Sequence, residues 1–165
     1  MTALTQLIID DDEIWLSDLP QYQSSAVTSL LSTGLGYEEA ASAWMSGSTA
    51  SNTAPFGTGL GLKLFFDSFL DELHDFLCIG RNYEQERNQL LSGFKPGQAG
   101  MAAYIAAAIA PQLDAAPSFL APAVALLLCA IGKLSLGAWC RMQSERRNQN
   151  PTESSTTPDG APGDE

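Results

Sequence analysis

The feature that most constrains this chain is a long apolar stretch in its C-terminal half. Residues 99–110 and 115–140 are rich in Ala, Leu and Ile, and Lys133 is the single charged side chain inside them. Pro111 and Asp114 separate the two runs. Ala favours helices, and the β-branched residues that favour strands are few here. The sequence therefore predicts an apolar helical hairpin, with small residues on its first arm and Leu on its second.

A hairpin of this kind can be buried in two ways. It can form the centre of a bundle whose other helices cover it on all sides. Alternatively it can enter a bilayer, because residues 119–137 have the mean hydropathy of a spanning helix and 115–140 would extend about 39 Å as one helix. Lys133 separates the two cases, since an ammonium at mid-bilayer costs about 2.5–3.5 kcal/mol. We expect the buried hairpin and keep the membrane as the alternative.

One side of the second arm is the candidate contact face for a bilayer or for a second copy of the chain in a homo-oligomer. Its members recur at steps of three and four, so a helix would place them on one face. They are Leu120, Val124, Leu127, Leu128 and Ile131.

The rest of the chain also has a mostly helical pattern. Residues 62–78 repeat apolar side chains at steps of three and four, which predicts an amphipathic helix. Shorter helices are predicted over 24–33, 37–46 and 83–92, where Gly follows each segment closely. Residues 47–61 are rich in Gly, Ser, Thr and Asn and predict a loop.

These elements predict an all-α fold, a small helical bundle of about six helices built around the apolar C-terminal helical hairpin 99–140. We expect one domain over residues 1–147, followed by a disordered acidic tail over 148–165, which has no large apolar side chain. The N-terminal stretch lacks the basic and apolar regions of a secretory signal. A cytoplasmic location is therefore expected, with membrane association in the alternative.

The charge is very unevenly distributed. The net charge is −11, yet residues 1–62 hold no Lys or Arg at all. A chain this acidic is not expected to bind nucleic acid, whose phosphates need basic side chains. We expect instead a protein partner with a basic face, steered by complementary charge. The candidate contacts are Asp10, Asp11, Asp12 and Glu13.

Residues 57–63, GTGLGLK, are the most motif-like stretch. Glycines before a helix can hold a phosphate on backbone N–H groups. Residues 57–62 resemble the Gly-rich box of the histidine-kinase type ATP-binding fold, which implies ATP binding. That family also carries an Asn-bearing helix and an Asp-x-Gly-x-Gly loop, and the sequence contains neither. We therefore interpret Gly57–Lys63 as a loop that leads into the next helix, and we expect no cofactor.

The predicted helix 62–78 carries several groups that are capable of chemistry. Asp67, Asp71 and Asp75 are spaced four apart and would share one face, as a divalent cation site requires, although a solvated face is the simpler interpretation. His74 and Cys78 are also four apart, which is the minimum for a thiol nucleophile. The surrounding acids would raise the thiol pKa and so work against that role. We name no catalytic or metal-binding residue.

The sequence thus favours a non-catalytic interaction or regulatory module with an acidic docking surface. The alternative is a membrane-inserting or pore-forming effector that releases hairpin 99–140, and an enzyme of unrecognised class comes third. Cys129 lies within the apolar second arm and is expected to be a buried free thiol.

Overall fold

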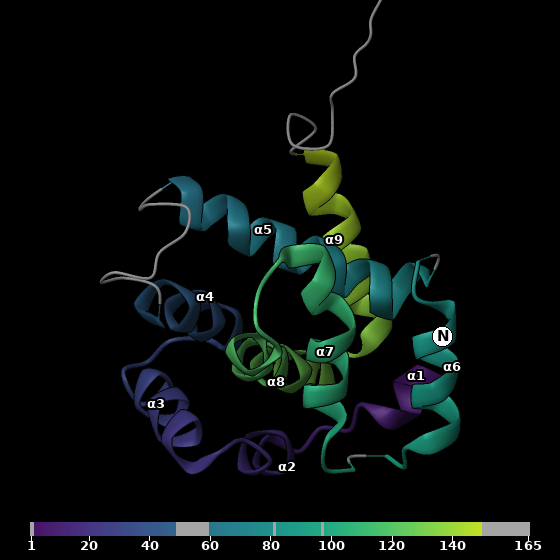
Figure 1. Cartoon of the computed structure of the whole chain (residues 1–165), viewed down its shortest axis with the longest axis horizontal. Coiled ribbons are helices and arrows are strands. Elements are labelled where there is room, and N and C mark those ends of the chain that lie inside the picture. Colours follow the sequence, from purple (N-terminus) through teal and green to yellow (C-terminus); the bar gives the residue numbers. More distant parts are fainter. Residues whose placement is uncertain (1, 49–59, 81, 97, 150–165) are drawn as a thin grey trace, which may run out of the picture.

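The computed structural model describes residues 2–48, 60–80, 82–96 and 98–149, and these residues form helices joined by short turns (Figure 1). The predicted all-α bundle built around an apolar C-terminal hairpin is confirmed. The tail predicted from residue 148 starts too early, because Asn148 and Gln149 belong to α9; from residue 150 onward it lies outside the described residues. Positions 49–59 of the predicted loop 47–61 also lie outside them, while 47–48 belong to α4 and 60–61 to α5. The helices are α1 (Thr2–Leu7), α2 (Asp12–Ser17), α3 (Gln21–Ser32), α4 (Tyr37–Ser48), α5 (Leu60–His74), the π-helix η1 (Asp75–Ile79), α6 (Glu84–Gly93), α7 (Met101–Leu113), α8 (Pro117–Leu134) and α9 (Leu136–Gln149).

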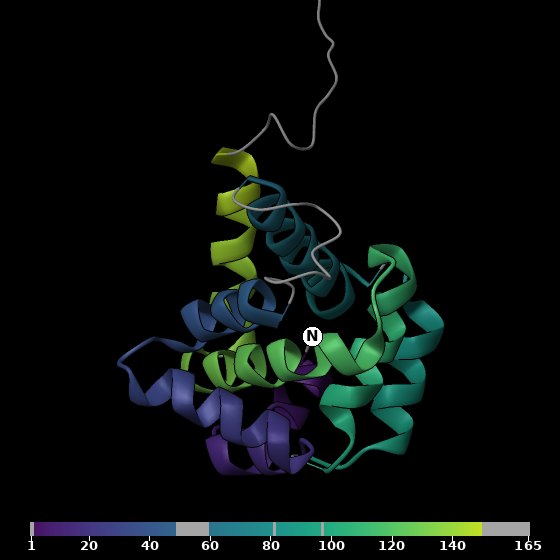
Figure 2. The ribbon, with the colours of Figure 1, turned by 60° about the vertical axis from the view of Figure 1, so that its left-hand side comes forward.

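Helix α8 is the centre of the molecule. It packs most extensively against α4 and α7, and it also contacts α2, α3 and α9. Figures 1 and 2 show the other helices arranged around it, with α2, α3 and α4 on one side and α7 on another. Nearly every side chain from Leu120 to Ile131 is buried. A helix that is apolar on all sides needs such a cover, because any exposed side would leave apolar surface in water.

The apolar run is not one continuous helix, which corrects the expectation that the second arm extends as one helix to residue 140. Helix α8 ends at Leu134, and Ser135 has a φ of +97°, which an α-helix cannot contain. The Ser135 hydroxyl oxygen accepts a hydrogen bond from the N–H of Ala138 at 3.2 Å, so this residue caps the start of α9. The apolar segment is therefore divided between the core helix and the first turn of α9.

Two short N-terminal helices were not predicted. Helix α2 and the turn before it cover the C-terminal end of α8, whereas α1 packs against α6 and α9. The turn between α1 and α2 passes so close to Gly132 that a Cβ there would lie 2.6 Å from the carbonyl oxygen of Ile9. The same oxygen accepts a hydrogen bond from Nε1 of the buried Trp15 at 3.1 Å. Because Gly132 has no side chain, the backbone of this turn lies directly on α8.

Helices α5 and α9 lie together beyond α4 and project away from the rest of the bundle (Figure 2). The last turn of α5 continues into η1, a π-type segment that ends at Gly80, whose φ is +77°. A π-turn contains one residue more than an α-turn and changes the direction of the side chains that follow it. This segment positions the residues described next.

Candidate functional site

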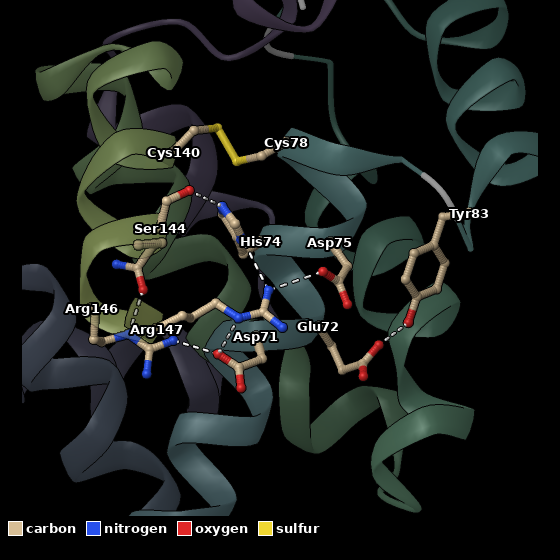
Figure 3. Close-up of polar contacts among 11 residues, drawn as sticks. Asp71, Glu72, His74, Asp75, Cys78, Tyr83, Cys140, Ser144, Arg146 and Arg147 are labelled. Carbon is tan, nitrogen blue, oxygen red and sulfur yellow. Dashed lines mark hydrogen bonds and ion pairs between the residues drawn. A yellow bond between two sulfur atoms is a disulfide. The ribbon is translucent and has the colours of Figure 1, made fainter. Parts of the chain in front are cut away.

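The three Asp side chains spaced along α5 and η1 face helix α9 and do not form a solvated face. Arg146 lies 2.6 Å from Asp71 and 3.8 Å from Asp67. Arg147 lies 3.0 Å from Asp75 and 3.4 Å from Asp71. Figure 3 shows Asp71 between the two guanidinium groups. The expectation of a solvated face is wrong for these residues, because α9 packs across α5 and supplies the opposite charge.

We call these residues, Asp67, Asp71, Asp75, Arg146 and Arg147, the α5–α9 ionic cluster. Its carboxylates are poorly placed to bind a metal cation. The described residues contain no group of three or more His, Cys, Asp and Glu side chains placed to hold a metal ion. One oxygen of Asp71 and one oxygen of Asp75 already accept hydrogen bonds from Arg146 and Arg147. A metal at this position would have to displace two guanidinium groups, each of which makes a charge-assisted hydrogen bond.

His74 is buried at the centre of the cluster, with 4% of its surface exposed. Its Nδ1 lies 2.9 Å from Nη1 of Arg147, and its Nε2 lies 3.2 Å from the Ser144 hydroxyl (Figure 3). Arg147 can only donate, so Nδ1 must accept and the ring proton is on Nε2. Burial, followed by the positive charge of Arg147, lowers the pKa of His74 below its ordinary value. The imidazole is therefore held neutral.

The same geometry decides against a serine nucleophile. Ser144, His74 and Asp75 have the composition of a catalytic triad. A triad needs an unprotonated Nε2 to take the serine proton and a carboxylate at Nδ1. Here Nε2 carries the proton and an Arg side chain faces Nδ1. The arrangement fixes α9 against α5 and has the wrong tautomer for proton abstraction from Ser144.

The Cys78–His74 nucleophile considered from the sequence is wrong. Cys78 forms a disulfide with Cys140, which lies 62 residues further along the chain, and their Cα atoms are 5.8 Å apart. A disulfide sulfur carries no thiolate and cannot serve as this nucleophile. Cys129 is a free thiol with 1% of its surface exposed, as expected, and burial raises its pKa to about 12.

The four N-terminal acids differ from one another in their surroundings. Lys133 Nζ lies 3.2 Å from Asp10 Oδ1 and 3.4 Å from Asp12 Oδ1. Asp12 also accepts a hydrogen bond from the Tyr37 hydroxyl, and burial together with this bond raises the pKa of Tyr37. Asp11 caps α2 by accepting from the N–H of Ile14 at 3.4 Å, while Glu13 is exposed. Two of the four acids, Asp10 and Asp12, therefore pair with Lys133 at the end of α8.

Helices α2, α3 and α4 form an acidic layer on one side of α8, which we call the N-terminal layer. Residues 2–48 contain acids and no Lys or Arg. Lys133 reaches this layer from α8, at Asp10 and Asp12. Residues 2–48 also hold Asp18, which accepts a hydrogen bond from the N–H of Gly100, and Glu38 and Glu39, both exposed at their surfaces. Partial desolvation of its carboxyl raises the pKa of Glu38. Tyr22 on α3 is 70% exposed and lies in the same layer.

The candidate bilayer or oligomer face lies inside the bundle. Leu120, Val124, Leu127, Leu128 and Ile131 are each 0% exposed. Helix α8 is long and apolar enough to cross a membrane, with a mean hydropathy of 1.8, but 61% of it is buried, and the core helix of a soluble protein has the same properties. Of the glycine motif, residues 57–59 lie outside the described residues, and α5 begins at Leu60.

Comparison with known proteins adds no assignment: no family model, no curated protein and no solved structure matches this chain.

Proposed function

We propose that the chain is a non-catalytic interaction module. Its acidic N-terminal layer binds the basic face of a protein partner. The observation that carries the proposal is charge segregation, since residues 2–48 hold acids without one Lys or Arg. Asp11, Glu13 and Glu39 are exposed, and none of the three has an ion pair among the described residues. A surface with one sign of charge raises the rate at which a partner of opposite sign associates.

The contacts that the acids of the N-terminal layer make within the chain indicate which of them are available to a partner. Asp10 and Asp12 are already paired with Lys133, so a partner would have to compete with that contact. Glu13 and Glu39 offer carboxylates that make no ion pair within the described chain, and α3 adds the exposed aromatic ring of Tyr22 to the same layer. Tyr is frequent at interfaces because it combines an apolar ring with a polar hydroxyl.

The test uses a Lys-rich helical peptide as the basic probe and the same peptide with Gln in place of Lys as its control. Backbone amide shifts in the full chain should change within residues 10–48 on addition of the basic peptide only. Binding should weaken as ionic strength rises, because exposed pairs are screened. Shifts spread evenly over the molecule, or binding that salt does not affect, would contradict the proposal.

Matched variants locate the docking surface. The triple change Asp11→Asn, Glu13→Gln and Glu39→Gln removes three charges and keeps side-chain oxygens that can accept the hydrogen bonds of the caps. At about 0.5 kcal/mol for each exposed pair, it should weaken peptide binding about tenfold. The control triple, Glu84→Gln, Asp114→Asn and Glu145→Gln, removes the same charge from exposed acids outside the layer. Equal weakening by both triples would show that only net charge matters.

A membrane-inserting effector is the second candidate, supported by the length and hydropathy of α8. At 18 residues it extends about 27 Å, close to the thickness of a bilayer core. Insertion would require the α7–α8 hairpin to leave its cover, including the Lys133 contacts with Asp10 and Asp12. Dye release from anionic vesicles by the full chain tests this idea, and vesicles that stay intact at neutral and acidic pH would rule against it.

We keep a cytoplasmic location as part of the proposal. Cytosolic disulfides in most organisms are transient and redox-sensing, whereas those of oxidising compartments are permanent. This location therefore requires the Cys78–Cys140 bond to be one that cellular thiols can open. Its oxidation state in the chain isolated from cells, after rapid thiol blocking, tests the location independently of any partner.

A further inference from the structure

A cavity of about 440 Å³ lies where η1 meets the start of α6, on one side of the disulfide. It is partly open to solvent, and its lining combines one cysteine of the disulfide with charged and polar residues. Its lining residues are Cys78, Ile79, Gly80, Glu84, Arg87 and Asn88.

The two sulfurs of the disulfide differ in their access to this cavity. Cys78 lines it and is partly exposed, and its neighbour Ile79 is 46% exposed. Cys140 is 7% exposed and is not among the lining residues. A solute that enters the cavity therefore meets Cys78, and Cys140 lies behind it in the core. Attack by a thiolate depends on such access, and the sulfur that is not attacked becomes the leaving group.

Arg87 supplies a positive charge in the same cavity. Its side chain lies over Gly80, where a Cβ would come within 2.4 Å of Nη1. Nη1 donates a hydrogen bond to the carbonyl oxygen of Phe76 at 3.2 Å, which fixes the guanidinium. No carboxylate within the described residues forms an ion pair with Arg87. An Arg guanidinium matches the geometry of a carboxylate and binds it through two parallel hydrogen bonds.

Glu84 opposes this charge from the lip of the cavity. It is exposed and one helical turn before Arg87, so water screens it more strongly than it screens the partly buried guanidinium. Together the two side chains determine how strongly the cavity favours an anionic solute over a neutral one, because Arg87 attracts an anion and Glu84 repels it. Each contribution can be removed separately.

We propose that this cavity is a thiol-exchange site for a small thiol that carries a carboxylate. The carboxylate binds Arg87, and the thiolate attacks the sulfur of Cys78. A new S–S bond forms between the thiol and Cys78, the Cys78–Cys140 bond breaks, and Cys140 leaves as a thiolate that takes a proton from water. A second thiol then attacks the bound thiol sulfur, which releases the small disulfide and leaves Cys78 reduced. Two small thiols supply the two electrons.

As a consequence, the covalent link between η1 and α9, the Cys78–Cys140 disulfide, would be closed or open according to the concentration of small thiols. When the disulfide is open, α9 is held to α5 by packing, by the ionic cluster of Arg146 and Arg147 and by the hydrogen bonds of His74. This inference does not rest on the acidic docking surface, and either proposal can fail without the other.

The experiment treats the full oxidised chain with glutathione, which is an anionic thiol, and with 2-mercaptoethanol, which is neutral. Acid quenching, alkylation and peptide mapping identify which cysteine carries the mixed disulfide, and they also separate Cys129 from the other two. The adduct is expected on Cys78. Rates are divided by the thiolate fraction of each reagent, and their ratio reports the charge preference. An adduct found mainly on Cys140, or no adduct with either thiol, would overturn the proposal.

Variants then test the role of the cavity charges. Arg87→Gln should lower the glutathione to mercaptoethanol rate ratio by at least about threefold, whereas Glu84→Gln should raise it. Lys95→Gln removes the same charge at an exposed position outside the cavity and should leave the ratio unchanged. Arg87→Lys keeps the positive charge and serves as a second test if Arg87→Gln impairs folding. Its rate ratio should remain above that of the Gln variant. A ratio that is unaffected in both Arg87 variants and in Glu84→Gln contradicts the assigned site.

Discussion

Nη1 of Arg147 lies 2.9 Å from Nδ1 of His74 and 3.0 Å from a carboxylate oxygen of Asp75, so one guanidinium joins a neutral ring to an acid. The contact holds only while Nδ1 has a free lone pair. Protonation of His74 would place two donors and two positive charges against each other. The α5–α9 interface is therefore sensitive to the protonation state of His74.

The first prediction concerns this pH dependence. Because the folded-state pKa of His74 lies below its ordinary value of 6.5, the unfolded chain binds the proton more tightly. The contribution of His74 to stability is thus complete above pH 6.5 and is lost progressively as the pH falls through that value. His74 is the single His of the chain, so its ring proton signals report the pKa directly by NMR.

Urea unfolding at several pH values between 5 and 7 measures the effect on stability. In His74→Gln the part of the slope due to the imidazole should disappear. A His74 signal that titrates at or above its ordinary pKa would contradict the assigned tautomer.

The second prediction concerns Asp71, which is the acid shared by both arginines. Its side chain is 28% exposed and lies 2.6 Å from Arg146 and 3.4 Å from Arg147. Asp71→Asn keeps the shape and leaves two guanidinium groups short of one negative charge, so it should lower the free energy of unfolding by about 1–3 kcal/mol. Glu145→Gln is the matched control, because Glu145 is an exposed acid of α9. Similar losses in both variants would show that the cluster contributes no more than a surface charge.

Only part of the ionic cluster could be predicted from the sequence. The four-residue spacing of Asp67, Asp71 and Asp75 correctly implied a shared face, because that depends on helix geometry alone. The basic partners lie on α9, more than seventy residues away, and no local pattern connects the two helices. One signal was present: two adjacent Arg residues end a helix in a chain with few basic side chains.

The apolar hairpin could be predicted because a long run of Ala and Leu excludes every structure except a buried or membrane helix. Helices α1 and α2 could not be predicted in this way. Each has six residues, which are too few to show a recognisable helical periodicity. The Cys78–Cys140 bond depends on the direction in which η1 places its side chains, and Cys spacing alone does not determine pairing.

The third prediction concerns the contact between the α1–α2 turn and α8. In Gly132→Ala the new methyl group would lie 2.6 Å from the Ile9 carbonyl oxygen, so the turn must move away. Overpacking of this kind costs about 1–3 kcal/mol, and hydrogen exchange in residues 4–15 should accelerate. Gly137→Ala is the control. No atom lies within 4 Å of the Cβ position, and Gly137 is within α9.

That control should stabilise the chain by about 0.4–1 kcal/mol, because Ala loses less backbone entropy than Gly in a helix. Opposite signs for the two Gly→Ala changes are therefore expected from thermal unfolding. If Gly132→Ala were as stable as the parent chain, the close approach of the turn to α8 would be incorrect.

The last prediction concerns the stability that the disulfide supplies. Cys78 and Cys140 are 62 residues apart, so their bond removes a large amount of conformational freedom from the unfolded chain. The loop-entropy relation gives about 4 kcal/mol for a loop of this length. The double variant Cys78→Ala and Cys140→Ala should therefore unfold at a clearly lower urea concentration than the oxidised chain. Under reducing conditions the parent chain should approach the stability of the double variant, whereas Cys129→Ala should retain its response to reductant. A double variant as stable as the oxidised chain would mean that the ionic cluster alone holds α9 on α5.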